Sequence, residues 1–215
     1  MKFPQDQFVA AIVASIKNNN LPMPKLLVDA ACGNGYTTLK LASYFSNTKF
    51  IGVDILSDFL QKNTKNVSFL QKDVHEFFEN ESELDNICLI NALFLLPEPI
   101  LLLQKIKDKL STNGIFYLII PNIEGKNFKR FQKISPETNT FIVSKKEMTQ
   151  ICEKLSFEIC ETKELVFTPF FNRIDTKFLF FIRHYYLTFL EFFNQKKNNQ
   201  TPSYFLFVLK SKQTN

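Results

Sequence analysis

Short apolar stretches alternate with amphipathic ones along the first 120 residues of the chain. Residues 5–18 repeat apolar side chains at helical spacing and predict an opening helix. Apolar stretches then predict strands over residues 25–30, 49–54, 67–71, 86–91 and 115–120. The intervening segments predict helices over residues 36–45, 58–65, 74–80 and 97–110, and Asn113 with Gly114 predicts a turn before the strand at 115–120. Strands and helices that alternate at such short intervals predict a mostly parallel sheet with helices on both faces.

The pattern changes after Pro121. Residues 121–143 are polar and mixed, which predicts a long loop. Ser144 and Glu147 have the spacing of a capping box and predict a helix that runs to Leu155. The remaining predicted elements are a sixth strand at 157–167, an extra helix at 175–194 and a last strand at 203–210. The extra helix therefore interrupts the alternation just before the last strand.

Composition and charge restrict the class of protein. The 215 residues are 45% hydrophobic and 22% charged, which fits one globular domain with a sizeable core. The formal net charge is only +5, and acidic and basic residues are interleaved, so a nucleic-acid partner is not indicated. The 4 cysteines lack zinc-ligand spacing, so we expect no metal site and free thiols in a reducing cytoplasm.

Targeting and membrane-spanning signals are the next features that bear on the location of the protein. The chain starts without an apolar targeting stretch. Its most hydrophobic late segment, residues 178–193, is interrupted by Arg183, His184 and Glu191, which excludes a membrane span there. We therefore expect a cytoplasmic protein.

The glycine turn after the first predicted strand is the strongest local signal. The chain has only 5 glycines, yet Gly33 and Gly35 stand one residue apart, which lets backbone amides approach a ligand closely. Asp54 ends the second predicted strand, where a carboxylate can accept hydrogen bonds from both hydroxyls of a ribose. Asp73 follows the third and is placed to meet an adenine amine. The carboxyl ends of these strands are therefore the candidate site for a nucleoside-bearing cofactor.

The glycine turn has two other interpretations. A nicotinamide-binding fold shares the strand, the turn and the acid, but it needs a third glycine where this chain has Thr38. An ordinary structural turn explains Gly33 and Gly35, but it leaves the acids after the next two strands without a role.

Further motifs follow in order along the chain. They occupy residues 28–35 (Val-Asp-Ala-Ala-Cys-Gly-Asn-Gly), 51–54 (Ile-Gly-Val-Asp), 71–74 (Gln-Lys-Asp-Val), 91–99 (Asn-Ala-Leu-Phe-Leu-Leu-Pro-Glu-Pro) and 103–121. Together they resemble the motifs of class I S-adenosylmethionine-dependent methyltransferases. The resemblance implies a Rossmann-like α/β fold: a seven-stranded, mostly parallel sheet with helices on both faces, an antiparallel last strand and an extra helix inserted before it. It also implies S-adenosylmethionine as the cofactor and S-adenosylhomocysteine as its product.

The resemblance also assigns residues and regions. It gives cofactor binding to Asp29, Ala31, Cys32, Gly33, Gly35, Asp54, Ile55, Asp73, Val74 and Asn91. It divides one methyltransferase domain, residues 1–215, into an N-terminal helix (1–24), a cofactor-binding core (25–121) and a substrate-side part (122–215) with the inserted helix 175–194. The family often has glycine where this chain has Ala31, so if this position needs a positive φ, the alanine would weaken cofactor binding.

The sequence is less informative about catalysis. A general base is needed only if the acceptor must lose a proton. The weak candidates are His184, Tyr185 and Tyr186, on the extra helix. His75 follows the adenine motif, where a solvated or capping role is favoured over that of a base. Many small-molecule methyltransferases have a histidine near Phe94, and the apolar residue here fits either an apolar acceptor or simple packing.

The function that follows is transfer of a methyl group to a small-molecule acceptor, with an apolar molecule as one candidate. Specificity is expected to lie in the opening helix with Phe8 and Val9, in the loop 121–143 and in residues 168–195. One alternative is a non-catalytic relative, a cofactor-binding or partner subunit that kept the fold. Another is an RNA or protein methyltransferase that uses the basic residues of the loop, which are Lys126, Lys129, Arg130 and Lys133.

Overall fold

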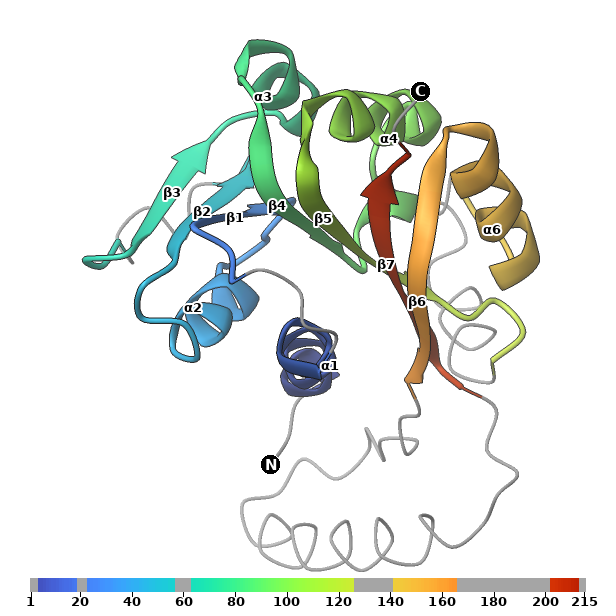
Figure 1. Ribbon diagram of the computed structural model, residues 1–215, viewed down its shortest axis with the longest axis horizontal. Helices are drawn as coiled ribbons and strands as arrows, with labels where there is room; N and C mark the ends of the chain where they lie inside the picture. Colours follow the sequence, from blue (N-terminus) through green and yellow to red (C-terminus); the bar gives the residue numbers. More distant parts are fainter. Residues whose placement is uncertain (1–3, 19–22, 57–62, 126–140, 166–201, 213–215) are drawn as a thin grey trace, which may run out of the picture.

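The computed structural model describes residues 4–18, 23–56, 63–125, 141–165 and 202–212. Its strands are β1 (Leu26–Ala30), β2 (Lys49–Asp54), β3 (Val67–Gln71), β4 (Leu84–Ile90), β5 (Leu110–Pro121), β6 (Phe157–Leu165) and β7 (Tyr204–Ser211). They form one sheet of 7 strands in the order β3-β2-β1-β4-β5-β7-β6 (Figure 1). β7 runs antiparallel to both of its neighbours, and the other pairs are parallel. The expected Rossmann-like sheet with an antiparallel last strand is therefore confirmed.

Helices cover both faces of this sheet (Figure 1). They are α1 (Pro4–Asn18), α2 (Tyr36–Ala42), α3 (Val74–Asn80), the 3₁₀ helix η2 (Leu93–Leu95), α4 (Pro99–Lys109) and α6 (Lys145–Lys154). Neighbouring residues of β1 point to opposite faces: Leu27 joins the buried cluster under α1 and α2, and Val28 joins the cluster under α3, α4 and α6. Both are fully buried, as expected for an inner strand of a parallel sheet that is covered on both faces.

Polar contacts fix α1 at two places. Near its start, Asp6 accepts a hydrogen bond of 2.8 Å from the hydroxyl of Tyr36, the first residue of α2. Near its end, the buried Ser15 donates to Glu161 Oε2 of β6 at 2.8 Å and accepts from Lys163 Nζ at 2.9 Å. These contacts hold the first turns of α1 beside the glycine turn.

The loop expected before Ile115 is instead an irregular part of β5. The strand begins at Leu110, directly after α4, and its register shifts between the pairs Leu84–Leu110 and Asn86–Ile115. A Cβ atom on Gly114 would lie 2.7 Å from a backbone oxygen of β4, so only glycine lets the two strands approach here. The predicted turn at residues 113–114 was therefore wrong.

Two other predictions differ from the described structure or fall outside it. The helix expected at 58–65 does not include its last residues, because Thr64 forms an isolated β-bridge with Val67. Residues 57–62 lie outside the described part of the chain, as do most of the loop 121–143 and all of the inserted helix 175–194. No helix among the described residues is long and apolar enough to cross a membrane.

Candidate functional site

A cavity of about 610 Å³ opens at the carboxyl ends of β1, β2 and β4. Its volume lies within the range that suits a small-molecule ligand. Eight of the ten predicted cofactor-binding residues line it: Ala31, Cys32, Gly33, Asp54, Ile55, Asp73, Val74 and Asn91. Gln5 and Phe8 of α1 and Leu95, Leu96 and Pro97 of the segment after β4 line it as well. Leu95, Leu96 and Pro97 belong to a predicted motif and Phe8 to the predicted specificity region, but nothing in the sequence indicated Gln5 here.

The turn after β1 forms one wall of the cavity through an unusual backbone. Ala31, Gly33 and Gly35 have φ values of 55°, 57° and 73°, all in the left-handed region. Glycine adopts this region without strain, whereas alanine does so at a cost. A Cβ atom built on Gly33 would have no atom within 4 Å, so the missing side chain leaves open space. Ala31 therefore does have the positive φ that was set as the condition, and the weaker cofactor binding expected from it stays a prediction.

Asp54 lies at the end of β2 and is held from both sides. Its Oδ2 accepts a hydrogen bond of 2.7 Å from the Gly33 N–H, and its Oδ1 accepts one of 3.0 Å from the Leu56 N–H. A carboxylate has about four lone-pair sites, so it still has acceptor capacity toward the cavity. Because the side chain is largely buried, its orientation is fixed before any ligand arrives.

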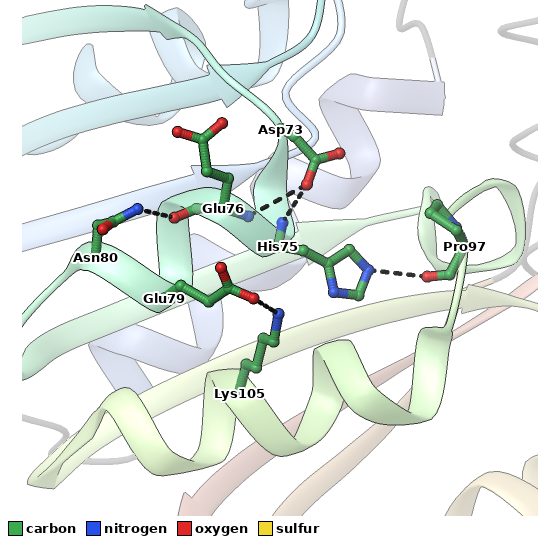
Figure 2. Close-up of polar contacts among 7 residues, drawn as sticks. All are labelled: Asp73, His75, Glu76, Glu79, Asn80, Pro97 and Lys105. Carbon is green, nitrogen blue, oxygen red and sulfur yellow. Dashed lines mark hydrogen bonds and ion pairs between the residues drawn. The ribbon is translucent and has the colours of Figure 1, made fainter.

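Asp73 caps α3 while lining the same cavity. Its Oδ1 accepts hydrogen bonds from the N–H groups of His75 at 2.8 Å and Glu76 at 3.2 Å (Figure 2). The capping satisfies two of the N–H groups that a helix leaves unpaired at its start. Among the described residues no donor reaches Oδ2, so this oxygen is available to a ligand.

Asp29 is buried beneath the cavity and does not line it. Its Oδ2 accepts a 2.6 Å hydrogen bond from the Thr38 hydroxyl of α2, and its Oδ1 accepts a 3.4 Å hydrogen bond from the Cys88 thiol of β4. Burial raises the pKa of this carboxyl to about 6. Gly35 also lies outside the lining, as the N-cap of α2. Their positions therefore fit support of the turn rather than the expected direct contact.

The segment after β4 forms another part of the cavity lining. Asn91 has a φ of 53°, and its N–H donates to the Ile119 carbonyl of β5 at 2.9 Å. The chain then turns through η2 and presents Leu95 to the cavity. Phe94 points elsewhere, into a small apolar crevice that it shares with Ile120 at the end of β5 and with residues 141–143. The apolar residues of this motif therefore line two different cavities: Leu95 lines the large one, and Phe94 lines the small one.

The sequence profile of a family described as a methyltransferase domain matches residues 25–158, which include the glycine turn, Asp54 and Asp73. The chain belongs to this methyltransferase family. The match confirms the resemblance to class I S-adenosylmethionine-dependent methyltransferases that the motifs indicated. A search of curated proteins finds no match.

Solved structures of methyltransferases have the same fold as this methyltransferase. A S-adenosylmethionine-dependent methyltransferase from Archaeoglobus fulgidus is 19% identical, with 94% of each chain covered and a TM-score of 0.62. The magnesium protoporphyrin IX methyltransferase from Synechocystis PCC 6803, solved with S-adenosylhomocysteine, is 16% identical over 96% of this chain and 83% of that chain, with a TM-score of 0.61. A chain from the complex of the Haloferax volcanii Trm112 methyltransferase activator with a methyltransferase is 17% identical over 97% and 91%, with a TM-score of 0.68.

The titratable side chains that line the cavity of this methyltransferase, within its described part, are Asp54, Asp73 and Cys32. Burial raises the pKa of the Cys32 thiol well above its usual value, so the thiol stays neutral at pH 7 and is a poor nucleophile. The catalytic candidates His184, Tyr185 and Tyr186 lie outside the described residues. Groups of three or more metal-ligating side chains do not occur in the described part of the chain.

Proposed function

We propose that this methyltransferase binds S-adenosylmethionine in the cavity at the carboxyl ends of β1, β2 and β4 and transfers the methyl group to a small-molecule acceptor. One observation carries the proposal: the Asp54 carboxylate faces the cavity while the N–H groups of Gly33 and Leu56 hold it in place. A buried carboxylate with spare lone pairs, beside a turn without side chains, suits a ribose joined to a group that must approach the backbone.

Some lining residues would hydrogen-bond the cofactor, and others would make apolar contacts with it. Asp54 would accept hydrogen bonds from the ribose hydroxyls, and the free oxygen of Asp73 would accept one from the adenine amine. Ile55 and Val74 would flank the adenine ring with apolar surface. Ile55 is 66% exposed without a ligand, so covering it with a flat ring would remove apolar area from water. Gly33 would let the amino-acid end of the cofactor lie against the backbone.

Bound S-adenosylmethionine supplies a methyl group on a positively charged sulfur, and the chain supplies alignment and exclusion of water. The described lining residues include two carboxylates and no lysine, arginine or histidine, which favours a cationic ligand over an anionic one. Leu95, Leu96 and Pro97 would exclude water beside the reacting atoms. The acceptor atom replaces the sulfur on the methyl carbon, and the electron pair of the broken bond stays on the sulfur.

We propose an acceptor with apolar surface. Phe8 of α1 and Leu95 of η2 both line the cavity, and Leu95 is 54% exposed in the absence of a ligand. The similar Synechocystis enzyme acts on magnesium protoporphyrin IX, a small molecule, which supports a small-molecule acceptor here. The described cavity shows no basic side chain that would bind an RNA phosphate, so the RNA alternative has less support.

A thermal-shift experiment tests the cofactor. S-adenosylmethionine, S-adenosylhomocysteine, NAD and ATP would each be added at about 100 times the expected Kd, which for a bound ligand adds about 2.7 kcal/mol of stability. For a chain of this length, that corresponds to an increase in Tm of roughly 5 to 10 °C. Increases with the first two ligands alone support the proposal. Equal increases with NAD, or none with any ligand, would contradict it.

A second candidate, a cofactor-binding subunit without activity of its own, has one observation in its favour. The described lining residues include no histidine, lysine or tyrosine that could act as a general base. The similar Haloferax volcanii methyltransferase was solved with an activator protein, which makes a partner-dependent enzyme a reasonable variant of this candidate. Cofactor binding without loss of labelled methyl from S-adenosylmethionine, across a broad panel of apolar acceptors, would favour it over the enzyme.

A further inference from the structure

His75 does not line the cavity itself, but it connects two segments that do. It follows Val74, which lines the cavity with Asp73 at the start of α3. A second wall includes Leu96 and Pro97, which lie between η2 and α4. The imidazole Nε2 of His75 lies 2.9 Å from the Pro97 carbonyl oxygen and joins the two walls (Figure 2).

The chemistry of this contact determines which tautomer is present. A backbone carbonyl only accepts hydrogen bonds, so the Nε2 atom of His75 must carry the hydrogen and donate it to Pro97. The other ring nitrogen, Nδ1, is buried and has no hydrogen-bond partner among the described residues. The ring is therefore oriented by one hydrogen bond, and rotating the ring would lose it without replacement.

Neighbouring polar contacts join α3 to α4 farther from the cavity. Glu79 Oε1 and Lys105 Nζ are 2.5 Å apart, and Lys109 Nζ donates to the Glu81 carbonyl at 2.6 Å (Figure 2 shows the first pair). None of these four residues lines the cavity. The two helices are thus held together independently of His75, whose contact reaches the cavity wall itself.

We propose that His75 is a positioning residue for the cofactor site. Its hydrogen bond to Pro97 sets the separation between the wall that carries Asp73 and Val74 and the wall that carries Leu96. The inference rests on the proposed function for its effect on the cofactor. Its effect on the wall itself is a property of the unliganded protein and is measurable without any ligand.

Three variants separate positioning from general stability. His75→Leu keeps similar bulk but removes the donor, and His75→Gln offers an amide Nε2–H at about the same distance from the backbone. Lys105→Met breaks the neighbouring ion pair and is the matched control on the same helix pair. Hydrogen–deuterium exchange of residues 91–98 in unliganded protein, the Tm, and calorimetric titration with S-adenosylhomocysteine are measured for each.

For His75→Leu we expect amide exchange within 91–98 to rise by about 5-fold and the Kd of S-adenosylhomocysteine to rise by about 3- to 10-fold. His75→Gln should restore both to within about 2-fold of the unmodified protein, and Lys105→Met should change neither by more than about 2-fold. Unchanged amide exchange in His75→Leu would overturn the proposal. So would increases in exchange and Kd in His75→Gln and Lys105→Met that equal those in His75→Leu. If the unmodified protein does not bind S-adenosylhomocysteine, the proposed function fails, and the exchange result still decides the role of His75.

Discussion

The backbone N–H of Gly33 donates a 2.7 Å hydrogen bond to the carboxylate of Asp54, which joins the turn after β1 to the end of β2. The same carboxylate accepts from the N–H of Leu56, so one side chain fixes the backbone at two places in the cavity lining. Asp54 therefore has two tasks in this account: it shapes the site, and it accepts hydrogen bonds from the ligand. Substitutions that separate charge, shape and space around this pair give the sharpest tests.

Asp54→Asn should weaken binding of S-adenosylhomocysteine by about 10-fold or more. An amide has a single acceptor oxygen, so its NH₂ group must face either the Gly33 or the Leu56 N–H, where two donors oppose each other. Calorimetric titration measures the change. Asp108→Asn, an exposed carboxylate on α4, is the control and should leave the Kd unchanged. Equal Kd values for both variants would remove Asp54 from the site.

Two glycine substitutions should produce different kinds of damage. Gly33→Ala places a methyl group where nothing lies within 4 Å, so it should cost only about 1 to 2 kcal/mol of stability from its φ of 57° but strongly reduce S-adenosylhomocysteine affinity. Gly52→Ala places a methyl group 2.5 Å from the Phe69 ring, so it should destabilise the fold by about 1 to 3 kcal/mol.

Urea denaturation and calorimetry on both variants check this pair. We expect Gly33→Ala to lose more affinity for S-adenosylhomocysteine than Gly52→Ala does. The reverse ranking would mean that the open space beside Gly33 is not where the ligand lies.

Ala31→Gly should stabilise the protein by about 0.5 to 1 kcal/mol. The φ of 55° strains the alanine by about 1 to 2 kcal/mol, and the greater freedom of glycine in the unfolded chain returns part of that gain. Ala30→Gly is the matched control, because Ala30 is a fully buried residue of β1 without positive φ, and it should lose about 1 kcal/mol. Urea denaturation gives both values, and a destabilised Ala31→Gly would show that the alanine is not strained.

Asp29 should make the stability depend on pH between about 4 and 6. Burial raises its pKa in the folded state from 3.8 to about 6, so in this interval the folded protein binds more protons than the unfolded chain. Stability then falls as the pH rises, by an amount on the order of 3 kcal/mol, and levels off above pH 6.

Asp29→Asn isolates this contribution, because the amide does not titrate and its oxygen still accepts from Thr38. Urea denaturation across this pH range should show the stability difference between the two proteins shifting in favour of the variant as the pH rises. A constant difference across the range would mean that Asp29 titrates in the folded protein as it does in the unfolded chain.

Local sequence patterns were sufficient for the order of the elements and for most of the site. Gly33 and Asp73 follow β1 and β3, and Asp54 ends β2; parallel strands bring their carboxyl ends to one edge, so these residues had to meet. The prediction for Asp29, direct contact with the cofactor, differs from its position beneath the cavity. Asp29 shares its strand with the motif, but the alternation of the strand turns its side chain toward Thr38 of α2 and away from the cavity.

Long-range packing explains the features that the sequence did not reveal. Gln5 reaches the cavity because α1 is held against α2 and β6, far away in the sequence, through Asp6 and Ser15. His75 meets Pro97 across 22 positions of sequence, and no local pattern encodes that distance. Gly114 looked like a turn residue, but its lack of a side chain serves a close approach of β4 and β5.

The most direct test of the central claim is a calorimetric titration of the unmodified protein with S-adenosylhomocysteine. The account predicts binding of one molecule per chain with a Kd in the micromolar range, about −8 kcal/mol. The absence of binding heat from a folded protein, at more than one temperature, would contradict the assignment of this cavity as the cofactor site.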